Sequence, residues 1–200
     1  MPTDGFSIQP LAADHRRDAF NCGVPALNAY LHRFARQDMD RGATVAYVAV
    51  PDQQPNDIAG YYTLAASGVR LDDFPPAVVK KLPKYPLVPA TLLGRLAVGL
   101  PHRGKGLGEW MLMDALERSL YVSASVGSAA VIVDAKDQRG AAFYARYGFQ
   151  QFASDGLRLF VPMRTIAALR RANIMLNTSC RRRYTFPNRS SRRPTAGPGP

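Results

Sequence analysis

The stretch from Leu92 to Gly108, LLGRLAVGLPHRGKGLG, constrains this chain of 200 residues more than any other. It begins as an apolar run, ends in a glycine-rich loop, and is followed from Glu109 by apolar residues at helical spacing. The expected order is therefore a strand, a tight turn and a helix. Because the first N–H groups of a helix have no partner within it, such a turn favours phosphate binding. Arg103 and Lys105 add two full positive charges to the turn.

Two nucleotide-binding motifs fit this loop poorly. Gly99 to Lys105 has the P-loop spacing, but Gly106 follows where that motif needs a Ser or Thr hydroxyl for magnesium. The stretch GKGLG also lacks the spacing of the dinucleotide fingerprint, G-x-G-x-x-G. The pattern that fits is R-x-x-G-x-G, which resembles the pyrophosphate loop of the GNAT acetyltransferases. The resemblance implies that acetyl-CoA is bound by backbone groups of two strand residues and by the loop, namely Ala97, Val98, Arg103, Gly104, Lys105, Gly106, Leu107 and Gly108.

A second block, further along the chain, resembles the same family. Residues 129–133, AAVIV, read as a buried strand, and residues 134–148 read as a loop and a short helix that ends at Gly148. GNAT enzymes place a Tyr shortly before a Gly-Phe pair, and here FYARYGF supplies Tyr144. The resemblance implies that Tyr144 is the general acid near the CoA sulfur. The alternative is a packing role beside Phe143 and Phe149. Asp137 stands where the family often has Asn.

Charge and composition exclude several other classes. The net charge is +11, but the nine Arg residues after position 163 leave 17 basic against 15 acidic residues in 1–163. The apolar runs are too short for a membrane span, and the N-terminus does not read as a signal peptide. Two Cys and three scattered His residues form neither a disulfide framework nor a metal site. We expect no metal, no membrane association and a cytoplasmic location.

One α/β (α+β) domain is expected over residues 1–173. The resemblance implies the GNAT acetyltransferase fold, in which a mixed but mostly antiparallel sheet of six or seven strands carries helices on both faces. The remaining elements read as strands at 6–11, 44–50, 58–69, 92–98 and 152–163, a helix at 25–40, and helical turns at 77–82 and 166–170. In the helix, Leu27, Tyr30, Leu31 and Phe34 share one face, as core residues do. The resemblance also implies that acetyl-CoA enters where the fourth and fifth strands separate.

Residues 174–200 differ in kind from the rest of the chain. RRRYTFPNRSSRRPTAGPGP is rich in Arg, Ser, Pro and Gly, and this composition is typical of a disordered tail. It is open whether this tail is an RNA-binding arm, an aberrant extension or a remnant of cloning.

Residues 5–169 most resemble bacterial GNAT toxins of toxin–antitoxin modules. The likeness lies in FNCGVPALNAYLHRFARQDMDRGATVAYVAV, in the two blocks above and in LFVPMRTIAAL. It implies acetylation of the α-amine of aminoacyl-tRNA, inhibition of translation, a ribbon-helix-helix antitoxin as partner and a homodimer. Two alternatives stay open: a GNAT enzyme acting on a small amine or a protein N-terminus, and a non-catalytic module that binds CoA or nucleic acid.

The charges around the predicted site suit a phosphate-rich substrate. No Asp or Glu occurs between Asp73 and Glu109, whereas six Lys or Arg residues do. An α-amine, with a pKa near 8, loses its proton far more readily than a lysine amine near 10.4, so it needs less help from a general base. The candidate contacts to substrate or tRNA are Arg95, Lys80, Lys81 and Arg36. The alternative is that these lysines only solvate a loop.

Overall fold

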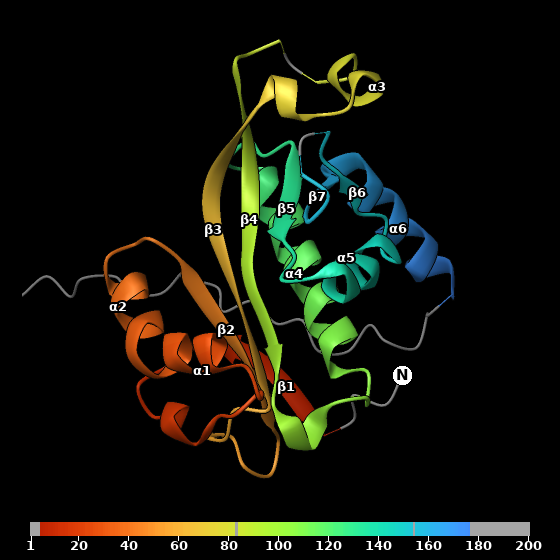
Figure 1. The fold of residues 1–200 in the computed structure, drawn as a ribbon. Helices are drawn as coiled ribbons and strands as arrows, with labels where there is room; N and C mark the ends of the chain where they lie inside the picture. The colour runs from red at the N-terminus through yellow and green to blue at the C-terminus, as the bar shows by residue number, and fades with distance from the viewer. Residues whose placement is uncertain (1–4, 83, 154, 177–200) are drawn as a thin grey trace, which may run out of the picture.

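A seven-stranded sheet forms the centre of the molecule, with strand order β1-β2-β3-β4-β5-β7-β6 (Figure 1). The computed structural model describes residues 5–82, 84–153 and 155–176. Every neighbouring pair of strands is antiparallel except β4 and β5. The predicted mixed, mostly antiparallel sheet is therefore confirmed. The strands are β1 (Phe6–Pro10), β2 (Val45–Pro51), β3 (Gly60–Arg70), β4 (Leu87–Val98), β5 (Ala130–Asp134), β6 (Gln150–Gln151) and β7 (Arg158–Pro162).

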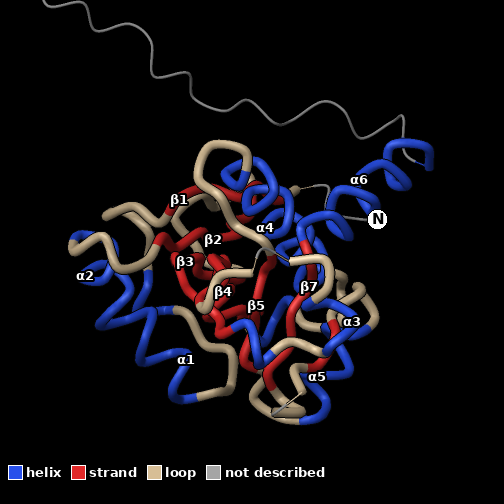
Figure 2. Tube along the Cα trace, turned by 90° about the horizontal axis from the view of Figure 1, so that it is seen from above, coloured by secondary structure: helices blue, strands red, loops and turns tan. Residues whose placement is uncertain are grey.

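Helices cover both faces of this sheet, as predicted (Figure 2). Residues from α4, α5 and α6 pack in one core cluster on one face. The helices α1 and α2 close a second cluster on the opposite face, and α3 closes a third cluster further along it. The helices are α1 (Pro25–Ala29), α2 (Ala35–Asp40), α3 (Pro76–Val79), α4 (Leu107–Ser123), α5 (Gln138–Ala145) and α6 (Met163–Leu176), with short 3-10 turns at 17–19, 71–73 and 100–102.

A π turn, η2 (Tyr30–Phe34), joins α1 to α2, so the predicted helix over 25–40 is present but not regular. A π turn holds more residues than an α turn and frequently occurs at functional sites. Tyr30 and Leu31 are buried as the spacing predicts, but Phe34 is 49% exposed. The expectation that Phe34 lies on the buried face is wrong, because the widened turn rotates it away from the sheet.

The strands β3 and β4 form one long hairpin that extends from Gly60↔Val98 to Arg70↔Leu87. Its far end, with α3, stands above the rest of the sheet in Figure 1 and is called the arm here. β4 begins at Leu87, five residues before the predicted strand. Pro89 made this part read as coil, yet its carbonyl accepts a hydrogen bond from the Ala129 N–H at 2.8 Å. Proline retains that acceptor although it has no N–H to donate.

The last described helix, α6, continues to Leu176, beyond the expected boundary at 173. The rest of the predicted tail, residues 177–200, lies outside the described residues. No helix in the described part of the chain is long and apolar enough to cross a lipid bilayer.

Candidate active site

The parallel pair β4 and β5 separates after only three residues. Its register runs from Ala90↔Ala130 to Leu92↔Ile132, and beyond Leu92 the described partner of β4 is β3 alone. The β3–β4 register shifts between Thr63 and Leu64, so that Gly94 is an extra residue in β4. Such a bulge bends a strand and interrupts its pairing. Gly94 is exposed although it lies in the middle of the sheet. The predicted separation of β4 and β5 is confirmed, because their pairing ends at Leu92 and Ile132.

The glycine loop lies at the end of β4 and leads directly into α4. Gly106 precedes the first residue of α4 with φ +80°, and Gly104 has φ +73°. Residues other than glycine rarely adopt this left-handed backbone conformation. The path of the backbone through the loop therefore depends on both glycines. The 17 residues of α4 then direct the free N–H groups of their first turn toward the loop. Glu109 lies in that first turn.

The two cations of the loop contact backbone carbonyl groups of the protein itself. The Arg103 guanidinium donates a hydrogen bond to the carbonyl oxygen of Cys22, just before α1. The Lys105 Nζ donates to the carbonyl oxygen of Pro101 at 2.9 Å. Both charges therefore stay near the loop, and Arg103 also ties it to the segment that leads into α1.

Tyr144 lies in an aromatic group on α5 and just after it. Its ring centre is 5.2 Å from that of Phe143 and 5.3 Å from that of Phe149. Burial raises the pKa of Tyr144 to about 12, which keeps its hydroxyl protonated at neutral pH. Tyr147 differs in its surroundings, because burial and then the Glu109 carboxylate raise its pKa.

Asp137, at the position where the family often has Asn, caps the helix α5. Its Oδ1 accepts a hydrogen bond from the Gly140 N–H at 2.8 Å, and its backbone is extended, as at a regular N-cap. The structure thus accounts for this carboxylate by helix capping.

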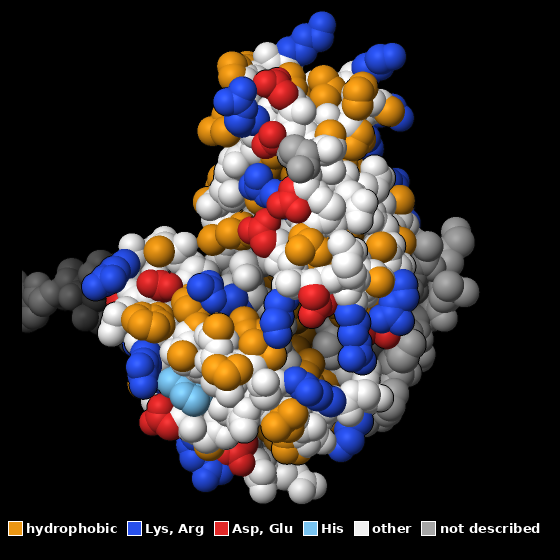
Figure 3. Space-filling model, in the orientation of Figure 1, with side chains coloured by type: hydrophobic (Ala, Val, Ile, Leu, Met, Phe, Trp, Pro, Cys, Tyr) orange, Lys and Arg blue, Asp and Glu red, His pale blue; other side chains and the backbone are white. Residues whose placement is uncertain are grey.

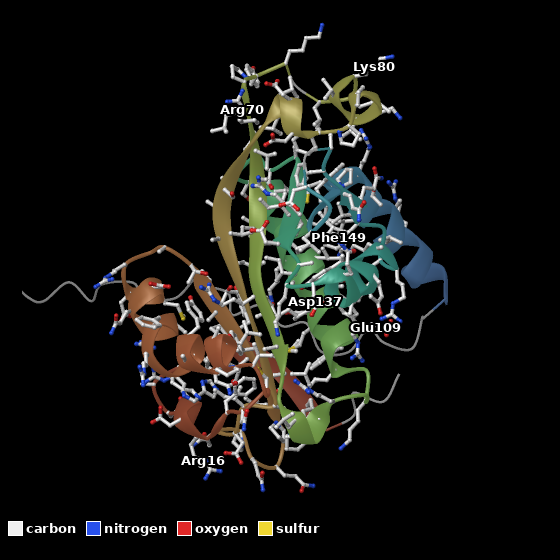
Figure 4. The ribbon with its side chains drawn as sticks, viewed as in Figure 1. Arg16, Arg70, Lys80, Glu109, Asp137 and Phe149 are labelled. Carbon is white, nitrogen blue, oxygen red and sulfur yellow. The ribbon has the colours of Figure 1, made fainter. Side chains whose placement is uncertain are left out.

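The four candidate substrate residues do not come together. Arg95 lies on β4 close to the separation of β4 and β5. Lys80 follows α3 in the arm, at the opposite end of the hairpin from Glu109, as Figure 4 shows. Lys81 is next to it and is also exposed. Arg36 lies on α2 and forms an ion pair of 3.4 Å with Asp40, one helical turn on.

One buried polar group was not predicted from the sequence. Asp114, on the inner face of α4, accepts hydrogen bonds from the Tyr62 hydroxyl and from Arg118 Nε, the latter at 2.7 Å. Arg118 also lies over the ring of Tyr47, which stacks on Tyr62. The one available signal was a carboxylate at a position of α4 where the helical period demands an apolar residue. Burial, followed by Asp114, strongly raises the pKa of Tyr62.

Within the described ranges, no three His, Cys, Asp or Glu residues gather in a group that would hold a metal ion. The backbone groups of β4, the glycine loop, Tyr144 and Arg95 stay the predicted residues of the site.

Comparisons with known proteins identify the family. No family model matches the chain. The "tRNA-acetylating toxin" of Mycobacterium tuberculosis is 33% identical over 151 residues, which cover 76% of this chain and 88% of that protein. A "Probable toxin TacT" of Sinorhizobium fredii is 26% identical over 170 residues, which cover 81% and 93% of the two chains.

Solved structures agree in fold, and this chain matches nearly the whole of each of them. A Tyr-to-Phe mutant of KacT has a TM-score of 0.78 at 29% identity and covers 82% of this chain and 99% of its own. AtaT in complex with acetyl-methionyl-tRNAfMet has a TM-score of 0.76 at 28% identity, with coverages of 82% and 98%. A Tyr-to-Phe mutant of AtaT bound to the C-terminus of the antitoxin AtaR has a TM-score of 0.70 at 27% identity, with coverages of 83% and 98%. With this fold, this loop and these relatives, the chain belongs to the tRNA-acetylating toxins of the GNAT acetyltransferase family.

Proposed function

We propose that this protein transfers the acetyl group of acetyl-CoA to the α-amine of an aminoacyl-tRNA and thereby stops translation. The observation that carries the proposal is the early separation of β4 from β5, with a glycine loop and a helix N-terminus at its end. This arrangement supplies unpaired backbone groups for the amides of pantetheine and N–H groups for a pyrophosphate.

The described residues suit acetyl-CoA. Ala97 and Val98 lie beyond the last β4–β5 pair, so their backbone groups on that side are available for pantetheine. Arg103, Gly104, Lys105, Gly106, Leu107 and Gly108 then hold the pyrophosphate, chiefly through N–H groups of the loop and the first turn of α4. We assign Arg103 a supporting role, because its guanidinium contacts Cys22.

The reaction is a direct transfer without an acyl-enzyme. The amine nitrogen attacks the thioester carbonyl carbon, the C–S bond breaks, and the nitrogen releases one proton to solvent. Tyr144 donates its hydroxyl proton to the departing thiolate and regains one from water. The buried Cys22 does not take part as a nucleophile, since its Sγ lies 3.1 Å from the side-chain oxygen of Asn28, within the segment before α1.

An α-amine is the acceptor that this site serves best. At pH 7 roughly 10% of an α-amine with a pKa near 8 is unprotonated, against roughly 0.04% of a lysine amine. The segment from 74 to 108, which contains β4 and the loop, has no carboxylate to act as a base. An acceptor that loses its proton easily makes such a base unnecessary.

The body of the tRNA is proposed to contact basic residues away from the reacting groups. Lys and Arg side chains gather at the tip of the arm (Figure 3), where Arg70, Lys80, Lys81 and Lys84 are exposed. At about 3.3 Å per residue, this tip lies roughly 20 Å along β4 from Gly94. Contacts at this distance would bind phosphates of the acceptor stem and add affinity without sequence preference. Arg36 would act in the same way from α2.

We further propose three properties that the family suggests. The protein acts in the cytoplasm, where aminoacyl-tRNA is found. It forms a homodimer. Its partner is an antitoxin with a ribbon-helix-helix domain, whose C-terminal segment binds the enzyme, in line with the AtaT–AtaR complex.

The test is cell-free translation with the purified protein, with and without acetyl-CoA, followed by mass spectrometry of the nucleosides released from tRNA. We expect inhibition only with acetyl-CoA, together with an N-acetyl-aminoacyl-adenosine that identifies the amino acid. Acetylation of free amines or protein N-termini with untouched tRNA would favour the alternative enzyme. Absence of any acetyl-CoA turnover would leave only a binding module.

A further inference from the structure

Arg95 lies between two core clusters on the face of the sheet that α1, α2 and α3 cover. Ala97, two residues after it, belongs to the cluster under α1 and α2. Ala90 belongs to the cluster under α3, and Leu92 packs against the same cluster. Arg95 is therefore the residue of β4 at which the cover changes from one set of helices to the other. It is partly exposed there, next to the exposed bulge residue Gly94.

The guanidinium of Arg95 lies over an aromatic ring. Its carbon Cζ lies 3.4 Å from the centre of the Tyr30 ring. Tyr30 in turn stacks on Tyr61 with the two ring planes 17° apart. No hydrogen bond or ion pair joins Arg95 to another residue that the structure describes. A guanidinium has five N–H donors in a fixed plane, so this side chain retains its full capacity to bind an anion.

The Tyr30 ring that lies under Arg95 is fixed by its surroundings. Tyr30 is 5% exposed. Burial, followed by a hydrogen bond to the Asp38 carboxylate, raises the pKa of Tyr30 to about 12, so the hydroxyl keeps its proton and is directed to Asp38. The face of the ring is the part of Tyr30 that is left for the guanidinium.

We propose that Arg95, supported by the Tyr30 ring, binds the phosphate of the terminal nucleotide of the acceptor RNA. This rests on the proposed function, because it assigns a contact to the same substrate. In an aminoacyl-tRNA only one ribose and the ester link separate the α-amine from that phosphate. Arg95 follows the bulge by one residue, so it is within reach of a phosphate whose nucleotide presents its amine at the separation of β4 and β5.

A phosphate fits these observations better than other anions do. The site is open to solvent beside Gly94, and a planar guanidinium binds phosphate oxygens with two parallel hydrogen bonds. The contact would carry no information about the amino acid or the base. Arg95 would position the 3′ end of the RNA, while other residues would determine the selectivity for the amino acid.

The first test measures binding and needs no acetyl transfer. The probe is a fluorescent RNA microhelix that ends in CCA, titrated into the wild type, Arg95→Gln and Arg95→Lys over a range of salt concentrations. We expect Arg95→Gln to weaken binding about 10-fold and to reduce the slope of log K against log salt by about 0.7 to 1. Arg95→Lys keeps the charge but loses the planar guanidinium, so its affinity for the RNA should lie between those of the wild type and Arg95→Gln. The control Arg16→Gln, at an exposed arginine paired with Asp57, should keep the wild-type slope. An unchanged slope in Arg95→Gln would overturn the proposal.

The second test separates the phosphate contact from a structural role. The substrates are an amide-linked aminoacyl-adenosine and its 5′-phosphate, carrying the amino acid found in the translation assay. We expect the 5′-phosphate to raise kcat/KM of the wild type about 10-fold over the nucleoside, chiefly through a lower KM. In Arg95→Gln, the ratio of kcat/KM for the phosphate to kcat/KM for the nucleoside should fall to about one. A ratio of one in the wild type, or an equal loss on both substrates in Arg95→Gln, would reduce Arg95 to a packing residue.

Variants of Tyr30 keep the proposal testable if Arg95→Gln does not fold. Tyr30→Phe retains the aromatic ring and should keep the wild-type ratio of kcat/KM between the phosphate and the nucleoside. Tyr30→Leu removes the ring under Arg95 and should lower this ratio. Equal ratios in these two variants would exclude the ring as the support. If neither nucleoside is acetylated by the wild type but RNA binding still depends on Arg95, the proposed reaction fails and the phosphate contact stands.

Discussion

The guanidinium of Arg103 donates a hydrogen bond to the backbone carbonyl of Cys22, although 81 residues separate them in the sequence. Arg103 is the first residue of the motif that indicates a pyrophosphate loop, while Cys22 lies at the start of the segment that leads into α1. The glycine loop is thereby anchored to the layer that covers the opposite face of the sheet. A contact of this kind fixes the shape of the loop before any ligand arrives.

The first prediction concerns this anchor. Arg103→Gln should lower the free energy of unfolding of the ligand-free protein by about 0.5 to 1.5 kcal/mol, the net contribution of a hydrogen bond, because Arg103 is itself exposed and solvent screens its charge. Urea denaturation measures it. Arg16→Gln, whose side chain is 63% exposed, serves as the control and should change the stability by less than about 0.5 kcal/mol. If Arg103→Gln weakens acetyl-CoA binding without any change in unfolding, the residue acts on the cofactor and not on the loop.

A second prediction follows from the left-handed backbone at Gly106. A Cβ there would meet no atom within 4 Å, so Gly106→Ala tests conformation without a steric clash. Forcing alanine into this region costs about 1 to 2 kcal/mol, and the loop should relax away from its binding shape. We expect the Kd for acetyl-CoA to rise about 10-fold in calorimetry. Gly127→Ala, where space is equally open and no positive φ is required, should bind as the wild type does. Equal affinity of the two variants would contradict the prediction.

A third prediction concerns the buried group around Asp114. Asp114→Ala leaves the Tyr62 hydroxyl and the largely buried Arg118 guanidinium without their shared partner. Removing one member of a buried charged pair costs about 3 to 5 kcal/mol, and we expect a loss of this size in urea denaturation. Asp114→Asn keeps an acceptor and should lose less. A loss below about 1 kcal/mol in Asp114→Ala would mean that water replaces the carboxylate.

The sequence predicted the parts of this fold that depend on local periodicity. Three such elements are present: the strand before the glycine loop, the helix after it and the strand near residue 130. Each is recognisable because the spacing of its apolar residues matches the side that it buries. The π turn at Tyr30–Phe34 was not predictable, since its residues have the spacing of an ordinary helix. The start of β4 was not predicted, because its prolines indicate coil. A strand can contain proline at positions where only the carbonyl group forms a hydrogen bond.

The site was predictable in its motifs but not in its long-range contacts. Gly104, Gly106 and Tyr144 are recognisable because their residue type and spacing are tied to a local turn or helix. The direction of Arg103 depends on Cys22, and the stacking of Arg95 depends on Tyr30, which only the folded sheet brings close. Sequence spacing carries no information on such pairs.

A fourth prediction is the pH dependence of acetyl transfer. The pKa of Tyr144 is raised to about 12, so its hydroxyl remains about 99% protonated at pH 10, and it loses the proton only as the pH approaches 12. The value of kcat/KM should therefore rise with deprotonation of the acceptor amine, near pH 8, and stay level to about pH 10.5. An amide-linked aminoacyl-adenosine is the substrate of choice, because esters hydrolyse in alkali. A decline above pH 9 that disappears in Tyr144→Phe would show that this hydroxyl ionises earlier.

The last prediction separates the two roles of Tyr144. Tyr144→Phe keeps the ring against Phe143 and Phe149 and removes only the hydroxyl. Without a proton donor the thiolate must leave as the anion, so kcat should fall by at least about 10²-fold, the scale of general-acid effects. The Kd for acetyl-CoA and the free energy of unfolding should change little, because the packing is preserved. Tyr147→Phe is the matched control, three residues on and beside Glu109, and should retain most activity. Loss of toxicity in growing cells should follow kcat in both variants. A Tyr144→Phe enzyme that acetylates aminoacyl-tRNA at the wild-type rate would make Tyr144 a packing residue and leave the thiolate to be protonated by solvent.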